Sequence, residues 1–242
     1  SDEQINILFS SRIPRTVSIL LSGSSLALSG LIMQQMMQNK FVSPTTAGTM
    51  EWAKLGILMS LLFFPNGPIL IKLLFAVVLS IVGTFLFVQL INLIRVKDVI
   101  FVPLLGIMIG GILSSFTTFV ALRTNALQSI GNWLTGNFAV ITSGRFEVLY
   151  LTIPLLILAF VFANHFTIAG MGKDFSHNLG VSYEKIIKIA LFITATLTAL
   201  VVVTVGTLPF LGLIVPNIIS IYRGDHLKNA LPHTLMLGAI FV

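Results

Sequence analysis

The sequence predicts an all-α fold in which several helices cross a membrane and form one polytopic transmembrane bundle. Of the 242 residues, 56% are hydrophobic and only 9% are charged, whereas soluble globular domains average about 25% charged residues. The apolar residues form long stretches, and a helix needs roughly 20 of them to cross about 30 Å of hydrocarbon. A transmembrane barrel would instead show alternating strands of about ten residues. Composition and stretch length therefore both favour spanning helices.

The apolar stretches give the expected spans in chain order. The long stretches lie at 14–36, 45–64, 68–94, 99–122, 147–169 and 185–205, and a shorter one lies at 206–222. An eighth begins near Leu231 and stops at Val242. We therefore expect a single transmembrane domain over residues 1–242, with about seven full spans and part of an eighth. Because the chain starts with Ser1 and stops inside an apolar stretch, we interpret it as truncated at both ends.

The distribution of lysine and arginine predicts the orientation, because basic residues are in excess on the cytoplasmic side. One set of alternating loops carries eight: Lys40, Arg95, Lys97, Lys173, Lys185, Lys188, Arg223 and Lys228. The other set carries five: Arg12, Arg15, Lys72, Arg123 and Arg145. We therefore place the first set inside. Arg12 and Arg15 then face outward, against the usual bias.

The connection at 123–146 is too polar for a span but carries Trp133 and Phe138. Amphipathic aromatic side chains settle at the level of the lipid headgroups. We therefore expect a short helix there, lying at the outer interface.

Several classes of function are excluded. The basic residues are too thinly spread for a nucleic-acid interface, and the absence of cysteine removes thiolate metal sites and cysteine nucleophiles. The four histidines lack the spacing of a zinc site. Residues 170–174 resemble a phosphate loop only superficially, because Asp174 replaces its Ser/Thr and Thr167 its first glycine. Without a Gly-x-Ser-x-Gly elbow, a serine hydrolase has no support either. We expect no cofactor, no bound metal and no catalysis.

Small residues are dense at 22–30, and Gly106 and Gly110 repeat the small-xxx-small spacing in a later span. Such residues let helix backbones approach closely in lipid. Close packing is therefore favoured over a pore lining. Gln34 and Gln35 end the first span, and their amides suit either freed helix carbonyls or a polar path.

Glu51 and Lys54 lie three residues apart, so on a helix they share a face and can form an ion pair. A charge inside hydrocarbon indicates function by default, because it costs at least about 2.5 kcal/mol on insertion scales. We place this pair near the inner end of its span, where long side chains reach the interface, and favour a structural role.

Three stretches together resemble one family. RIPRTVSILLSGSSLALSGLIMQQMMQNKFVSP at 12–44 is similar to an arginine-leucine-proline-arginine opening followed by a small-residue span. GTLPFLGLIVPNIISIYRGDHLKNALP at 206–232 is similar to a glycine-rich stretch with a following Gly-Asp-His, and MGKDFSHNLGVSYEKI at 171–186 to a cytoplasmic turn. The order matches the FecCD-type permease subunits of bacterial ATP-binding-cassette importers for iron-siderophore, haem and cobalamin. That family has ten spans, so the resemblance implies that the first, the last and most of the ninth lie outside this chain.

The resemblance implies roles for residues at both ends of the bundle. Arg12 and Arg15 match the arginines that meet acidic residues of the binding protein, an assignment we favour over anchoring at lipid headgroups. The loop at 170–186 would couple to the ATPase through Gly172, Lys173, Asp174, Leu179 and Gly180. The cytoplasmic gate would comprise Asn39, Phe41, Val96, Lys97 and Asp98. Three residues depart from the family pattern: Lys40 replaces a proline, and Asn217 and Ser220 replace a histidine and an arginine.

The implied function is that of a non-catalytic permease subunit in the bacterial cytoplasmic membrane, importing an iron-siderophore complex. Its expected partners are ATPase subunits, a substrate-binding protein, a second permease subunit (a copy or a paralogue) and the lipid bilayer. One alternative keeps this role with haem or cobalamin as substrate. Another is a secondary transporter driven by an ion gradient, for which Glu51 is the one carboxylate well inside a full span. An intramembrane enzyme lacks the required nucleophile and base.

Overall fold

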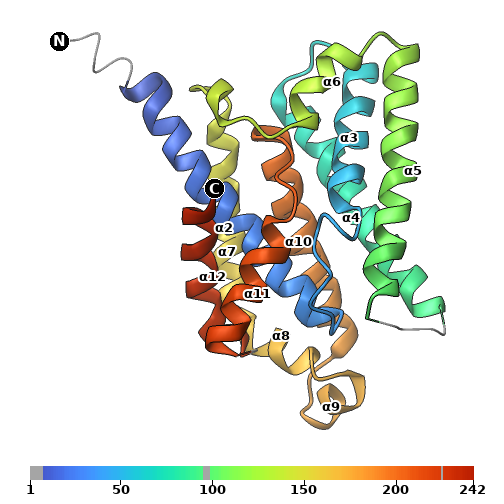
Figure 1. The fold of residues 1–242 in the computed structure, drawn as a ribbon, viewed down its shortest axis with the longest axis vertical. Coiled ribbons are helices and arrows are strands. Elements are labelled where there is room, and N and C mark those ends of the chain that lie inside the picture. Colours follow the sequence, from blue (N-terminus) through green and yellow to red (C-terminus); the bar gives the residue numbers. More distant parts are fainter. Residues whose placement is uncertain (1–7, 95–98, 225) are drawn as a thin grey trace.

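The structure, a computed structural model, describes residues 8–94, 99–224 and 226–242, and helices without strands make up the regular structure of this part (Figure 1). The elements are η1 (Leu8–Arg12), α2 (Ile13–Met36), α3 (Thr49–Phe63), α4 (Ile69–Leu93), α5 (Phe101–Arg123), α6 (Leu127–Leu134), η2 (Phe138–Val140), η3 (Phe146–Leu151), α7 (Thr152–Val161), α8 (Ala163–Ala169), α9 (Lys173–Asn178), α10 (Tyr183–Thr204), α11 (Leu211–Arg223) and α12 (Leu227–Phe241). The expected all-α fold is confirmed.

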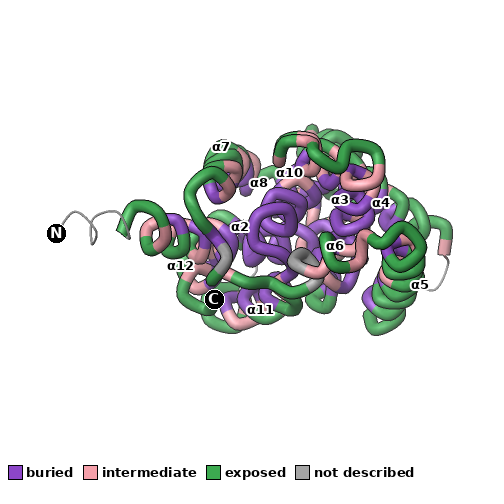
Figure 2. The backbone as a smooth tube through the Cα atoms, turned by 90° about the horizontal axis from the view of Figure 1, so that it is seen from above, coloured by how far each residue is buried: buried purple, intermediate pink, exposed green. Residues whose placement is uncertain are grey.

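Helix α2 lies inside the bundle, against α10, α11 and α12 (Figure 2). Its small residues explain how the neighbours come so close. A Cβ atom at Gly30 would overlap the backbone of Gly212 in α11, and one at Gly23 would overlap the backbone of Gly238 in α12. Ser24 Oγ also donates to the carbonyl of Leu235 at 2.9 Å. The small residues of the first span therefore serve close packing, as expected.

A second group of helices consists of α3, α4 and α5. Gly56 of α3 lies against the α4 backbone at Phe75, and a Cβ atom at Gly106 of α5 would overlap the carbonyl of Thr46. Gly106, one of the two glycines with small-xxx-small spacing, thus also serves close packing. Beyond this contact α5 is exposed: only 22% of an apolar 18-residue segment of this helix is buried, against 72% of the corresponding segment of α10. One side of α5 is therefore not covered by the rest of the described chain.

Within the described ranges, four helices are long and apolar enough to cross a membrane: η1 with α2, α4, α5 and α10. The segment from η3 through α7 continues into α8 across a bend of 59°, and this bent pair gives a fifth crossing if it is one span. The stretches expected at 45–64 and 206–222 form shorter helices, α3 with 15 residues and α11 with 13. Irregular backbone precedes both, including Gly48 and Phe210 in left-handed conformations. The count of seven full spans stays a prediction.

The connection at 123–146 does contain a short helix, α6. Ile130 of α6 is buried against Leu58 of α3 and Ala121 of α5. The helix is thus attached to the α3–α5 side of the bundle, and its position at the outer lipid interface stays a prediction.

Candidate functional site

Arg12 and Arg15 lie at the start of the long first span, and both are exposed. Arg15 Nη2 donates to the carbonyl of Ala139 at 3.3 Å. The loop that contains Ala139 also contacts the chain just before Arg12, because Ser143 Oγ donates to the carbonyl of Phe9 at 3.2 Å. The two guanidinium groups therefore stand on a surface formed by η1, α2 and the 137–145 loop.

The same end of the bundle carries an excess of positive charge. Besides Arg12 and Arg15 it holds Lys72, Arg123 and Arg145, whereas Glu147 is the one carboxylate there within the described ranges. Arg145 is half-buried and donates to the carbonyl of Val203 at 3.3 Å, near the C-terminal end of α10. Burial lowers the pKa of Arg145 by desolvation, but an arginine remains protonated in proteins. Arg145 thus anchors the loop, whereas Arg12 and Arg15 are exposed.

The loop expected to couple to an ATPase forms a compact turn at the opposite end of the bundle. Gly172 and Gly180 have φ values of 108° and 73° and bracket the short helix α9. Such angles favour glycine because a side chain would be strained there. Buried Ser176 donates to the carbonyls of Gly172 at 2.8 Å and Ile168 at 3.2 Å, which attaches α9 to the preceding turn.

The remaining predicted residues of this loop point outward. Lys173, Asp174 and Leu179 are all exposed. Lys173 Nζ lies 3.3 Å from Glu184 Oε1 at the start of α10, in an exposed pair that contributes little stability. The structure therefore brings the predicted coupling residues together on one exposed turn.

The predicted gate residues begin directly after α2. Asn39 is buried, accepts from the backbone N–H of Phe41 at 2.9 Å and donates to the carbonyl of Val99 at 2.9 Å. Phe41 is half exposed. Val96, Lys97 and Asp98 lie outside the described residues, but the bond to Val99 joins the chain after α2 to the chain that enters α5.

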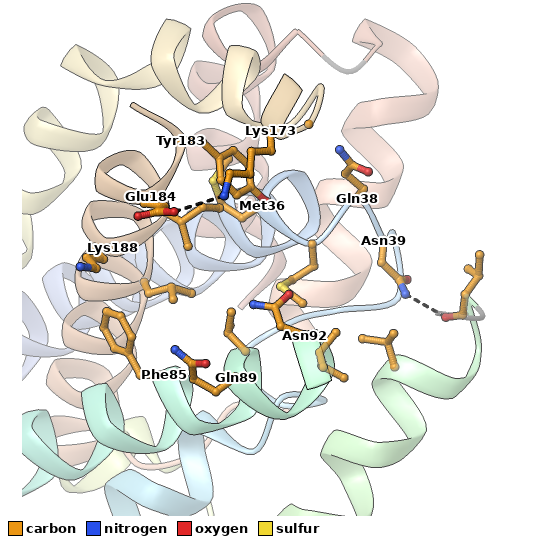
Figure 3. Close-up of a pocket in the computed structure, with 18 residues that line it drawn as sticks. Met36, Gln38, Asn39, Phe85, Gln89, Asn92, Lys173, Tyr183, Glu184 and Lys188 are labelled. Atoms are coloured by element: carbon orange, nitrogen blue, oxygen red, sulfur yellow. Dashed lines mark hydrogen bonds and ion pairs between the residues drawn. The ribbon is translucent and has the colours of Figure 1, made fainter. Parts of the chain in front are cut away.

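A cavity of about 710 Å³ lies between the gate segment and the coupling turn (Figure 3). Lys173 and Glu184 line one side of it, and Gln89 and Asn92 of α4 line the other. A second cavity of about 410 Å³ shares Gln38 with the first. Gln38 was not a predicted site residue, and its left-handed φ of 48° has no visible signal in the sequence.

The three residues that depart from the family pattern meet in space. Lys40 Nζ donates to Ser220 Oγ at 2.6 Å, and Asn217 Nδ2 donates to the backbone carbonyl of Lys40 at 2.9 Å. Asn217 also donates to the carbonyl of Leu213 at 2.8 Å, one turn earlier in α11. These bonds connect the gate segment to α11.

Gln34 and Gln35 use their amides in packing as well as lining the smaller cavity. Gln34 Nε2 donates to the carbonyl of Leu213 at 3.4 Å, and a Cβ atom at Gly170 would overlap the Gln35 side chain. Gln34 thus bonds a carbonyl of α11 rather than one at the end of its own helix, and both glutamines line the smaller cavity, so the choice between the two roles stays open.

Glu51 and Lys54 form the expected ion pair, with Oε1 and Nζ 2.7 Å apart. Glu51 lies in the first turn of α3, so the pair is near the end of its helix that the sequence places inside. This end of α3 lies beside Thr84, whose hydroxyl is 3.0 Å from that of Thr49, nine residues before the end of α4, which is roughly 13 Å of helix. The depth of the pair in the membrane stays a prediction.

A bundle of apolar helices joined by short polar turns, with distinct polar constellations at its two ends, is the architecture of a multi-pass membrane protein. The sequence pattern of the FecCD transport family matches residues 1–242, so the chain belongs to that family.

Individual relatives agree with this assignment. The petrobactin import system permease protein YclN of Bacillus subtilis is 54% identical over 242 residues, which cover all of this chain and 77% of that protein. The ferric-anguibactin transport system permease protein FatD of Vibrio anguillarum is 38% identical over 96% of this chain and 74% of its own length. Among solved structures, a metal-chelate type ABC transporter in an inward-facing conformation matches all of this chain and 78% of its own, with a TM-score of 0.83 and 22% identity.

Proposed function

We propose that this protein is the membrane-spanning subunit of an ATP-driven importer in the bacterial cytoplasmic membrane, and that it moves an iron-siderophore complex received from a binding protein. The observation that carries the proposal is the family match along the whole chain, together with 54% identity to a petrobactin permease. Haem and cobalamin are disfavoured as substrates, because the relatives at 54%, 39% and 38% identity are named for petrobactin or ferric anguibactin.

The two ends of α2 support a division of labour. Arg12 and Arg15 stand at one end and Asn39 follows the other, separated by a helix of 24 residues, which is about 36 Å long. The first end suits docking of an acidic binding protein, because guanidinium groups hold carboxylates in a bidentate geometry. The second end suits control of the path on the cytoplasmic side.

The coupling turn is proposed to contact the ATPase subunits. Lys173, Asp174 and Leu179 are exposed on a turn held by two left-handed glycines and by the anchored Ser176. A rigid, exposed element of this kind transmits movement of a partner better than a mobile loop does. Energy for transport would enter here, because ATP hydrolysis is expected on the partner.

The translocation path is proposed to form between two permease subunits, either two copies of this chain or this chain and a paralogue. The exposed side of α5 supports this arrangement, since most of the apolar segment of this helix is not buried by the rest of the chain. Alternating access would then follow from contacts that differ between two states, with the binding protein outside and the ATPases inside.

The ion-gradient alternative loses its best candidate residue. A coupling carboxylate must exchange a proton or cation during transport, whereas Glu51 is already paired with Lys54 at 2.7 Å. The structure thus favours transport driven by the ATPase subunits and the binding protein over transport driven by an ion gradient.

Reconstitution tests the proposal. The assembled transporter in proteoliposomes, with its ATPase and binding protein, should accumulate ⁵⁵Fe-labelled ferric petrobactin only when ATP is supplied. Vesicles that contain the permease without the ATPase are the control. Equal uptake by those vesicles would contradict the proposal.

A further inference from the structure

Three consecutive residues after α2 are each bonded to a different part of the molecule. Gln38 binds the turn before α9, Asn39 binds the chain that enters α5, and Lys40 binds α11. We propose that residues 38–40 are a relay that passes movement of the coupling turn to the gate and to α11, with Gln38 as its positioning residue. This inference rests on the proposed function, because it assumes that the coupling turn moves with a partner ATPase.

The first contact joins the relay to the coupling turn. Gln38 Nε2 donates to the carbonyl of Gly170 at 2.9 Å, and a Cβ atom on Gly172 would lie 3.6 Å from the same nitrogen. One turn earlier on α2, the Gln35 side chain fills the space beside Gly170. The turn before α9 is therefore held by one directed bond and one steric contact, both from the end of α2.

The backbone at Gln38 shows that this contact has a cost. Its φ of 48° lies in the left-handed region, where residues other than glycine, asparagine and aspartate are disfavoured. Strain of this kind persists only where surrounding contacts hold it. The bond from its side chain to Gly170 holds Gln38 in this conformation.

The second contact joins the relay to the chain that enters α5. Asn39 is 6% exposed, and both ends of its amide are used: Oδ1 accepts from Phe41 N–H and Nδ2 donates to the Val99 carbonyl, each at 2.9 Å. A buried amide with both ends satisfied has one favourable orientation. A shift of Asn39 therefore changes the position of Val99 or breaks the bond.

The third contact joins the relay to α11. Lys40 donates to Ser220 Oγ at 2.6 Å, and its own carbonyl accepts from Asn217 at 2.9 Å. The side chain and the backbone of one residue are thus bound to one face of α11, a turn apart.

The three-residue relay is too short to extend much. Consecutive Cα atoms lie 3.8 Å apart, so residues 38 and 40 are separated by at most about 7.6 Å. A displacement of the Gly170 turn by an ångström or two is not absorbed by so short a segment when all three residues are bonded. The two cavities beside Gln38 leave space for such a displacement.

The test separates transmission from transport. Gln38→Gly keeps the left-handed backbone and removes the donor, whereas Gln38→Glu keeps the size and replaces the donor with an acceptor. In the reconstituted transporter, both variants should lower ferric petrobactin uptake per ATP hydrolysed, by about two- to tenfold for one hydrogen bond. ATP hydrolysis stimulated by the binding protein should persist. Gln128→Ala, which alters an exposed amide of α6 that lines neither cavity, is the matched control and should keep the wild-type ratio.

A second readout follows the gate directly. Residues 1–242 contain no cysteine, so Val99→Cys introduces one reporter thiol among them, and Asn39 binds the carbonyl of this residue rather than its side chain. The same preparation without the substitution gives the background labelling. ATP should change maleimide labelling of this cysteine in the otherwise wild-type protein, and Gln38→Gly should abolish that change.

The outcomes are distinguishable. An active wild type with unchanged uptake ratio and unchanged ATP-dependent labelling in Gln38→Gly would overturn the relay alone. A wild type that takes up ferric petrobactin without ATP or ATPase would overturn the proposed function. If Gln38→Gly is absent from the membrane, Gln38→Glu decides by the same two measurements.

Discussion

Lys54 Nζ lies 2.7 Å from Glu51 Oε1, one helical turn apart on α3, and the two side chains are only 10% and 21% exposed. Glu51 packs near Gly110 of α5, where a Cβ atom would lie 3.6 Å from Glu51 Cγ. The pair is thus enclosed where α3 meets α5. It is oriented by packing as well as by charge.

Removal of one partner should destabilise the protein strongly. Lys54→Met leaves a carboxylate without its counter-charge, and breaking a buried pair costs roughly 3–5 kcal/mol. The double variant Glu51→Gln/Lys54→Met removes both charges and should recover most of that loss. Thermal unfolding of the purified protein in detergent measures both effects. Equal destabilisation by the single and the double variant would contradict the prediction.

Reversal of charge at Arg12 and Arg15 should prevent docking of the binding protein. Two glutamates would repel an acidic surface, and the loss of interfacial charge pairs costs at least about 2 kcal/mol, or roughly 30-fold in Kd. Binding to the permease in nanodiscs, measured at two salt concentrations, tests this. Lys228→Glu makes a similar charge change at the opposite end and should leave Kd unchanged. Unaltered docking by the arginine variant would exclude these residues as the contact.

Substitution at the coupling turn should separate ATP hydrolysis from uptake. Gly180 has φ of 73°, so Gly180→Val adds strain of about 1–3 kcal/mol and distorts the turn. Asp174→Lys reverses a charge on its exposed face. Each variant is expected to hydrolyse ATP with little uptake of ferric petrobactin. The nearby exposed change Asn178→Ala is the control, and normal coupling in the Gly180 and Asp174 variants would refute the assignment.

Enlargement of Gly30 should disrupt the bundle. Because a Cβ atom there would overlap the backbone of Gly212, Gly30→Leu must push α11 away from α2 and should cost about 3 kcal/mol or more. Gly131→Ala, where nothing lies within 4 Å of the added atom, should be almost neutral. The melting temperature in detergent distinguishes the two. A Gly30→Leu protein as stable as the wild type would show that this contact is not tight.

Much of the fold follows from local patterns in the sequence. The starts of α4 and α5 and the short helix α6 agree with the expected stretches to within a few residues, because apolar stretch length reports directly on spanning helices. The expected start at residue 45 fails for α3, which begins at Thr49. There Ser43 and Thr46 bond to each other's backbone and side chains, and these local bonds compete with helix formation.

The site was only partly predictable. Gly172 and Gly180 were recognisable as turn residues, and both have the positive φ that favours glycine. Gln38 was not recognisable, because its bond to Gly170 spans 132 residues and no local pattern encodes it. Lys40, Asn217 and Ser220 were noticed as separate departures, and only the folded chain shows that they meet.

The glycine contacts of α2 have a mechanical consequence. At Gly30 and Gly23 the helices approach backbone to backbone. At these two contacts α11 and α12 can shift relative to α2 with few rotamer changes. The hydrogen bonds of residues 38–40, at the end of α2, would then determine the direction of such a shift.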